Sequence, residues 1–202
     1  MKNDVDGRSM VEMLGVLAVV GVLSLGALAG YSKAMLMNKL NIQSEQLSTI
    51  FNNSMILLDK FDNTTSSTTL NEIFKNMHIV PENMIDSSGQ ISDVFHNKIE
   101  VGISGSTAYS YMHLDVILPK FNTLQCINLL KVAQRHHALL WKIGFPGINE
   151  DSSSFYKELA YGDYWTRTPQ LKDLTIEKIT EYCQVYNGKM KRFRFQWNYT
   201  AR

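Results

Sequence analysis

The first sixty residues carry the strongest hydrophobic pattern in the chain. No charged residue stands between Glu12 and Lys33, and residues 13–32 are dominated by Leu, Val, Ala, Gly and Met. Beyond Lys33, apolar residues recur at spacings of three, four or seven positions, the period of an amphipathic helix. These residues are Leu36, Leu40, Leu47, Ile50, Leu57 and Phe61. The pattern predicts one long helix, apolar at first and amphipathic later, that ends near residues 61–62.

The apolar part of this helix is long enough to cross a membrane. A twenty-residue helix spans about 30 Å, the thickness of the hydrocarbon core of a bilayer. A cleaved secretory signal and a plain single-span anchor are two ordinary interpretations. Ala27-Leu28-Ala29 fits signal-peptidase cleavage. However, the segment before Leu14 holds two basic and three acidic residues, whereas a secretory signal begins with a clear positive charge.

Turn-forming residues separate shorter elements downstream. The Ser/Thr-rich stretch 63–69 predicts a loop, and Thr69 with Glu72 forms a capping box for a short helix that runs through Asn76. A turn at 86–89, Asp-Ser-Ser-Gly, comes next. Two strands are then predicted, joined by a Gly-Ser link. They lie near residues 98–104 and 109–118.

The last third of the chain predicts a helix, a loop-rich stretch and a hairpin. A second long helix is predicted at 122–140, with one stripe through Leu124, Ile127, Leu130 or Lys131, and Ala138 or Leu139. The loop-rich stretch runs from Phe145-Pro146-Gly147 to Pro169, and Thr175 then opens a helix that leads to Cys183. Asn187-Gly188 is a hairpin signal between residues 184–186 and a strand through Tyr199. Together these elements predict an α+β fold, a long helix packed on an antiparallel sheet.

Composition and charge narrow the class of protein only a little. The 202 residues carry a formal net charge of +1, so no global field draws the chain onto nucleic acid or an acidic membrane. Hydrophobic residues make up 45% of the chain, which can fill a core and excludes a disordered protein. We therefore predict no nucleic-acid partner.

Basic residues concentrate at the C-terminal end without an acidic residue among them. They are Lys189, Lys191, Arg192, Arg194 and Arg202. They form either a basic interaction patch or the solvent face of a final strand. Ordinary strand alternation favours the second interpretation and places Phe193, Phe195 and Trp197 on the buried side.

The residues around Glu12 give a sharper clue to function. A charged side chain inside a membrane span costs about 2.5–3.5 kcal/mol on insertion scales, so it needs a partner or a purpose. The sequence Gly7-Arg8-Ser9-Met10-Val11-Glu12-Met13-Leu14-Gly15-Val16-Leu17 resembles the class III signal of type IV pilins and pseudopilins. In that family a dedicated inner-membrane peptidase cuts after the glycine, the new N-terminal amine is methylated, and a glutamate stands fifth in the mature chain.

The resemblance assigns roles to three residues. It implies that prepilin peptidase cuts after Gly7, that Arg8 becomes the N-terminus, and that Glu12 is the assembly glutamate, which meets the N-terminal amine of a neighbouring subunit. Arg8 departs from the apolar residue usual at this position. In a helix Arg8 and Glu12 lie four residues apart, so they can also pair within one subunit. Both pairings of Glu12 stay open.

The resemblance also divides the chain into four parts. They are a leader peptide at 1–7, a transmembrane and polymerisation helix at 8–32, its amphipathic continuation at 33–62 and a globular pilin domain at 63–202. Glycines within the span permit close helix packing in the fibre core, or are simply frequent in membrane helices. These are Gly15, Gly21, Gly26 and Gly30.

The middle of the chain resembles type IVb pilins in particular. Residues 80–85, 89–95 and 98–101 follow the passage in which a Pro-x-x-Met loop precedes a strand. Ala29 stands where many pilins of the first class have a proline. The implied fold is a long N-terminal spine helix, packed on an antiparallel sheet with additional helices and one disulfide.

The cysteines and histidines indicate structure rather than catalysis. Cys126 and Cys183 fit no CxxC or zinc pattern, and outside the cytoplasm they are expected to form one disulfide. In type IVb pilins such a bridge bounds the variable surface region. His136 and His137 would point about 100° apart on a helix, so a shared metal is not expected. We find no phosphate-binding loop or nucleophile motif, and predict no metal, cofactor or enzymatic activity.

The leading hypothesis is a structural subunit, a major or minor pilin, of a type IV pilus or related filament that supports adhesion, aggregation, DNA transfer or secretion. Its expected partners are its own copies, prepilin peptidase, the inner-membrane assembly machinery, and membrane lipid before assembly. Its expected location is the bacterial inner membrane, as a single-pass precursor with a periplasmic globular domain, and then the extracellular pilus. The alternative is a membrane-anchored or secreted periplasmic binding domain with an ordinary signal or anchor.

Overall fold

The computed structural model describes residues 10–57, 67–106, 109–119, 122–146, 156–163, 167–185 and 191–197. The chain divides between Lys39 and Leu40 into two compact units, and helix α1 contributes to both. The helices are α1 (Met10–Ser54), η1 (Met55–Leu57), α2 (Ser67–Asn76), η2 (Glu82–Met84), α3 (Thr123–Arg135), η3 (Leu171–Asp173) and α4 (Ile176–Val185). The strands are β1 (Lys98–Ser106), β2 (Tyr109–Ile117), β3 (Leu140–Pro146), β4 (Tyr156–Tyr161) and β5 (Arg192–Trp197). The architecture is α+β, as predicted.

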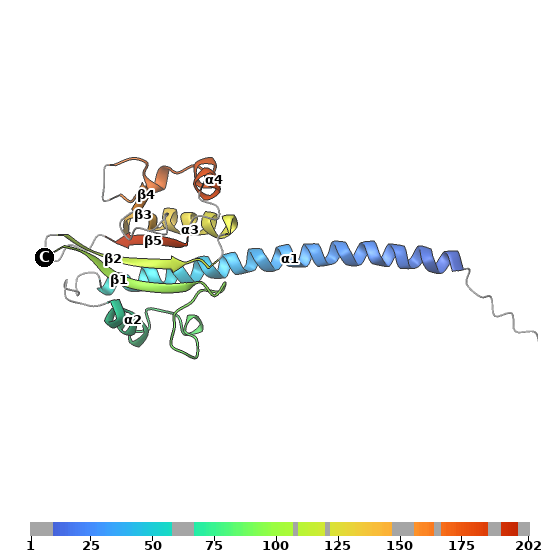
Figure 1. Cartoon of the computed structure of the whole chain (residues 1–202), viewed down its shortest axis with the longest axis horizontal. Helices are drawn as coiled ribbons and strands as arrows, with labels where there is room; N and C mark the ends of the chain where they lie inside the picture. The colour runs from blue at the N-terminus through green and yellow to red at the C-terminus, as the bar shows by residue number, and fades with distance from the viewer. Residues whose placement is uncertain are drawn as a thin grey trace, which may run out of the picture. The chain divides into compact units, whose positions relative to one another are not determined.

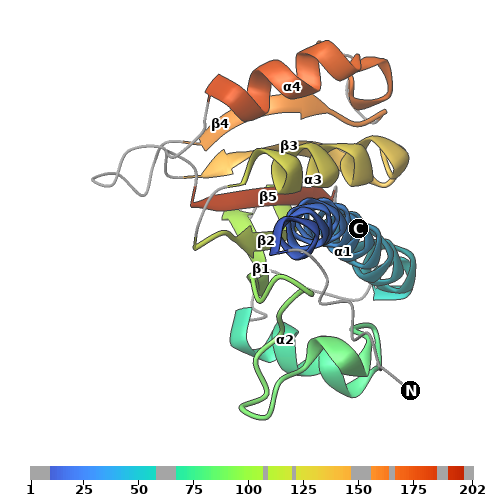
Figure 2. The same cartoon turned by 90° about the vertical axis from the view of Figure 1, so that its right-hand side faces the viewer.

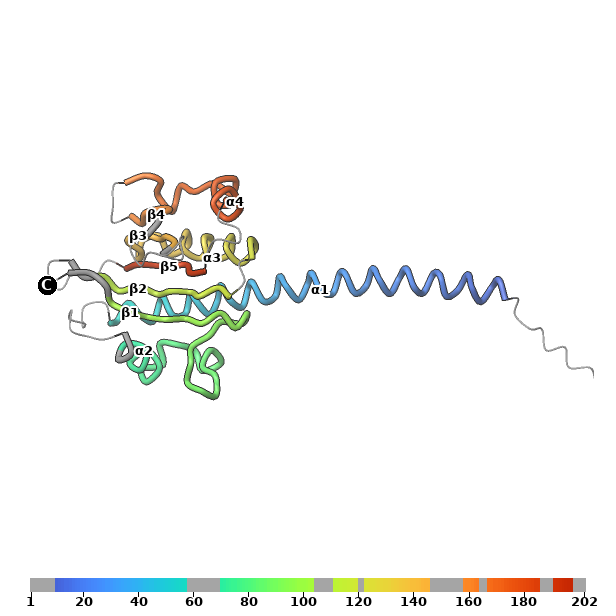
Figure 3. Tube along the Cα trace, viewed as in Figure 1, coloured from blue at the N-terminus to red at the C-terminus, as the bar shows by residue number. Residues whose placement is uncertain are grey.

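The five strands of the Leu40–Arg202 unit form one antiparallel sheet in the order β1-β2-β5-β3-β4 (Figure 3). The last strand in the sequence, β5, occupies the centre and pairs with both β2 and β3. The C-terminal strand therefore joins the β1–β2 hairpin to the β3–β4 hairpin.

Helices α1 and α3 cover the same face of this sheet (Figure 2). The buried face of α1 begins at Leu40 and includes Leu47, Ile50 and Phe51. The Phe51 ring packs at 5.0 Å from the Phe195 ring and 5.2 Å from the Trp197 ring, measured between centroids. Burying aromatic rings of this size dominates the energetics of a small core.

Strand β5 alternates as predicted. The side chains of Phe193, Phe195 and Trp197 are fully buried against the helices. Arg192 and Arg194 lie at the intervening positions and pair with Asp115 on the other side of the sheet. In Figure 1, strands β1 and β2 run in front of α1. The basic residues of this strand thus belong to a structured sheet face.

The first half of the sheet also follows the predictions. β1 and β2 form the expected antiparallel pair, and β1 extends two residues beyond the predicted end, to Ser106. Gly89 in the turn at 86–89 has a positive φ of 79°, which glycine adopts without a steric penalty. Helix α2 ends at Asn76 as predicted but starts at Ser67, so Thr69 lies inside the helix and does not cap it.

The predicted helix at 122–140 is too long. Asn122 caps α3, its side-chain oxygen accepting from the Leu124 amide at 2.8 Å, but the helix ends at Arg135 and Leu140 opens strand β3. The buried side of α3 is also different from the predicted stripe. It consists of Gln125, Cys126, Leu129, Leu130, Val132 and Ala133, while Leu124 is 45% exposed.

Two further predictions near the C-terminus are wrong. Residues 156–161, predicted within a loop-rich stretch, form the edge strand β4. Gln184 and Val185, predicted as one arm of a hairpin, lie in the last turn of α4, and β5 pairs instead with β2 and β3. Asn187 and Gly188, and the α1 continuation at residues 58–62, lie outside the described residues.

Candidate assembly helix and ectodomain sites

The Met1–Lys39 unit presents an apolar helix with exposed side chains on all of its faces. α1 is the one helix among the described residues that is long and apolar enough to cross a membrane. Met10 is 83% exposed, Tyr31 64% and Val20 52%. A helix that is apolar all round is stable only inside lipid or inside a protein core. This segment therefore needs surroundings that a single copy of the chain does not provide.

Two serines of this segment form hydrogen bonds within the helix. The Ser24 hydroxyl donates to the Val20 carbonyl oxygen at 2.7 Å, and the Ser32 hydroxyl donates to the Leu28 carbonyl oxygen at 2.9 Å. A hydroxyl without a partner is costly in hydrocarbon, so these bonds make both serines compatible with a bilayer.

Glu12 lies in the first turn of α1, at the end of the apolar segment. A carboxylate in this position interacts favourably with the positive end of the helix dipole. Gly7 and Arg8 lie outside the described residues. The pairing of Glu12 with the N-terminal amine of a neighbouring subunit and its pairing with Arg8 of the same subunit therefore both remain predictions.

The glycines of the span have open space around them. An added Cβ would meet no atom within 4 Å at Gly15, Gly21, Gly26 or Gly30. Packing within one chain therefore does not require glycine at these positions. Gly26 and Gly30 are four residues apart and lie on one side of the helix, where a second helix can approach closely.

A cluster of polar side chains holds α1 where the Leu40–Arg202 unit begins. Asn128 of α3 donates from its amide nitrogen to the Leu40 carbonyl oxygen at 2.9 Å and to Gln43 Oε1 at 3.0 Å. The carboxylate of Asp93, 3% exposed, accepts from Gln43 Nε2 at 2.5 Å and from Asn97 Nδ2 at 2.9 Å. Buried polar groups of this kind specify one arrangement, because any other leaves them unsatisfied.

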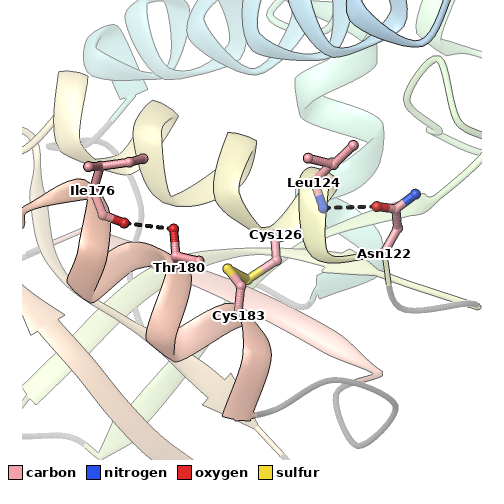
Figure 4. Close-up of a disulfide and its surroundings, with 6 residues drawn as sticks. All are labelled: Asn122, Leu124, Cys126, Ile176, Thr180 and Cys183. Atoms are coloured by element: carbon pink, nitrogen blue, oxygen red, sulfur yellow. Dashed lines mark hydrogen bonds between the residues drawn. A yellow bond between two sulfur atoms is a disulfide. The ribbon is translucent and has the colours of Figure 1, made fainter. Parts of the chain in front are cut away.

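The disulfide predicted between Cys126 and Cys183 is present. It joins α3 to α4 with a Cα–Cα distance of 5.7 Å, and both cysteines are fully buried (Figure 4). The 57-residue interval between them contains β3 and β4, the outer two strands of the sheet. The bridge therefore joins α3 to α4 and closes the loop that carries these two strands.

The sheet face opposite α1 carries a buried ion cluster. Asp115 of β2, with a side chain only 1% exposed, accepts from Arg192 Nη1 at 2.8 Å and from Arg194 Nε at 2.6 Å. Burial and, next in size, the positive charge of Arg194 together lower the pKa of the nearby His113 to about 4, so this imidazole is neutral at pH 7. Charge-assisted pairs of this geometry are among the stronger hydrogen bonds in proteins.

The two adjacent histidines face different partners. His136 forms the C-cap of α3, and its Nε2 lies 3.0 Å from the Ser48 hydroxyl. His137 Nδ1 lies 2.9 Å from Asp163 Oδ2. Among the residues that the structure describes, no group of three or more His, Cys, Asp or Glu side chains could hold a metal ion.

Comparison of the chain with protein-family models, with curated proteins and with solved structures gave no match.

The sequence did not point to the polar clusters of the Leu40–Arg202 unit. Asn128 and Asp93 are 35 residues apart in the sequence, and each contacts α1, so their proximity depends on the tertiary fold. Asp115 gave a usable signal, since it is the one acidic residue in the mainly apolar run 112–118. A buried carboxylate requires a positively charged partner, and in the structure Arg192 and Arg194 on the final strand provide it.

Proposed function

We propose that this chain is a structural subunit, a major or minor pilin, of a type IV pilus or a related pilus-like filament. The observation that carries the proposal is the exposed apolar stretch of α1 with Glu12 in its first turn. In this account the helix lies first in the bacterial inner membrane and later in the core of a fibre. Both environments surround the helix with apolar atoms, which its uniform surface requires.

The features of the apolar segment support both stages. Ser24 and Ser32 satisfy their hydroxyls within the helix, as residence in lipid requires. The open space at Gly26 and Gly30 favours close approach of a neighbouring helix. A charge at Glu12 is tolerated in an apolar fibre core only if a cation meets it, and the N-terminal amine of a neighbouring subunit provides one.

The Leu40–Arg202 unit supports a location outside the cytoplasm. Its buried Cys126–Cys183 disulfide is typical of proteins in oxidising compartments. We infer that this unit faces the periplasm in the precursor and the exterior of the filament after assembly. Its partners in this account are prepilin peptidase, which cuts after Gly7, the inner-membrane assembly machinery and further copies of the chain.

Substituting Glu12 tests the proposal. In cells that carry a matching assembly system, Glu12→Ala should leave precursor processing intact and lower the yield of sheared filaments by about tenfold or more, since the pairing that aligns incoming subunits is lost. Gly7→Phe should block processing itself. Glu45→Ala, at an exposed position of the same helix, is the matched control and should assemble normally. Normal filaments from Glu12→Ala would remove this residue from the mechanism.

A further inference from the structure

A polar cleft of about 700 Å³ opens in the Leu40–Arg202 unit where α2 lies beside β1. Helix α2 contributes Glu72 and Lys75, strand β1 contributes Lys98 and Glu100, and Arg192 comes from β5. Its volume lies within the range of small-molecule binding sites, roughly 300–1,000 Å³. The assembly role proposed for α1 makes no use of this cleft.

The charged side chains of the cleft neutralise one another. Lys75 Nζ lies 2.6 Å from Glu72 Oε1, and Lys98 Nζ lies 2.7 Å from Glu100 Oε1. Arg192 binds the buried Asp115 and also reaches within 3.6 Å of Glu100. An anionic ligand would have to displace the carboxylates, and a cation would have to displace the ammonium groups. The lining therefore disfavours a ligand that binds through its net charge.

A peptide strand is disfavoured for a different reason. The Ile99 amide donates to the Ile91 carbonyl oxygen at 2.8 Å, and the Val101 amide donates to Asn71 Oδ1 at 3.1 Å. These are the amides that an added strand would need along this part of the edge of β1. Both are already engaged within the chain.

The remaining ligand class is an uncharged molecule rich in hydroxyl groups. A hydroxyl donates one hydrogen bond and accepts others. Each lysine–glutamate pair places a donor and an acceptor within 2.7 Å of each other, which matches neighbouring hydroxyls on a sugar ring. We propose that this cleft binds a neutral oligosaccharide.

The floor of the cleft fits this assignment. His113 lines it with an imidazole that is 9% exposed. At pH 7 the ring is neutral, because burial and Arg194 keep its pKa at about 4. It thus adds no charge to the lining of the cleft.

Binding to an oligosaccharide array tests the proposal. The full chain would be held in dodecylphosphocholine, which has no sugar headgroup. It would be presented with di- to tetrasaccharides of glucose, galactose, mannose and N-acetylglucosamine, and with sialylated and sulfated counterparts. At least one neutral member should bind with a Kd of about 1 mM or lower. Raising salt from about 0.05 to 0.5 M should leave that binding unchanged, since no net charge is involved.

Variants of the two ion pairs connect binding to the cleft. Lys98→Met and Glu72→Gln should each weaken binding about tenfold, the effect of one lost hydrogen bond to a charged group. Lys178→Met removes a similar exposed pair, with Glu181 on α4, and should have no effect. The proposal fails if no neutral member binds at about 10 mM, if only acidic sugars bind and salt abolishes the binding, or if Lys98→Met binds normally. Such a failure would not bear on the proposed role in filament assembly, because that role is tested separately by the substitution of Glu12 in α1.

Discussion

The Asn128 side-chain amide donates a 2.9 Å hydrogen bond to the carbonyl oxygen of Leu40. Leu40 is the first buried residue of α1. This bond therefore ties α3 to the spine helix at the point where α1 enters its own hydrophobic core. The Ser44 hydroxyl completes the arrangement by donating to Asn128 Oδ1 at 2.9 Å.

Asn128→Ala should destabilise the folded chain. The substitution removes three hydrogen bonds and leaves Gln43 and Ser44 without one of their partners. We expect a loss of about 1–3 kcal/mol in the free energy of unfolding, measured by denaturant titration of the full chain in detergent. Asn41→Ala changes an exposed asparagine of α1 and should stay within about 0.5 kcal/mol of the parent protein. Equal stability of the two variants would contradict this account of the cluster.

Removing the disulfide should lower the free energy of unfolding more than Asn128→Ala does. Replacing both Cys126 and Cys183 by serine frees a loop closed by a 57-residue interval. The chain-entropy treatment then predicts a loss of about 4 kcal/mol. Adding a reductant to the parent protein at the unfolding midpoint should produce the same shift. Detection of free thiols in the unreduced folded protein would show that the bridge is not formed.

The stability of the chain should fall in mildly acidic solution because of His113. Its folded-state pKa of about 4 lies below the ordinary value of 6.5, so the unfolded chain takes up a proton first as the pH drops. The stabilising contribution of neutral His113 is complete above pH 6.5 and is lost progressively down to pH 4. The shift corresponds to about 3 kcal/mol in the free energy of unfolding.

Comparison with His113→Gln isolates this effect. The groups that face His113 are Glu100, Asp115, Arg192 and Arg194, and the variant retains all of them. His136, whose pKa is also lowered by burial, is present in both proteins. The difference in unfolding free energy between the parent protein and the variant should therefore change between pH 7 and pH 4.5. A difference independent of pH would contradict the assignment to His113.

The periodic patterns of hydrophobic residues in the sequence predicted much of the fold. The helix beginning near residue 10, the β1–β2 pair and the inward aromatics of β5 depend on local periodicity, which one face of a helix or strand enforces. The Cys126–Cys183 bridge needed only the assumption of an oxidising compartment.

The secondary-structure predictions were wrong where tertiary contacts determine the conformation of the segment. Residues 136–140 continue an apolar pattern, but α3 ends at Arg135 because Leu140 pairs with Trp197 across the sheet. Gln184 and Val185 have strand propensity, yet Cys183 holds their segment as a helix against α3. Neither long-range contact leaves a trace in the local sequence. The polar cleft beside β1 was missed for the same reason, since its residues come from α2, β1, β2 and β5.

The identity of the first residue in the mature protein tests the central claim most directly. Mass analysis of the chain recovered from filaments or from the inner membrane should find Arg8 at the N-terminus, with the apolar helix retained. A chain that begins at Gly30 would indicate ordinary signal-peptidase cleavage and a secreted domain. An intact Met1 would indicate a plain membrane anchor. Either of these two results would contradict the proposal that the N-terminal helix is the polymerisation element of a pilin.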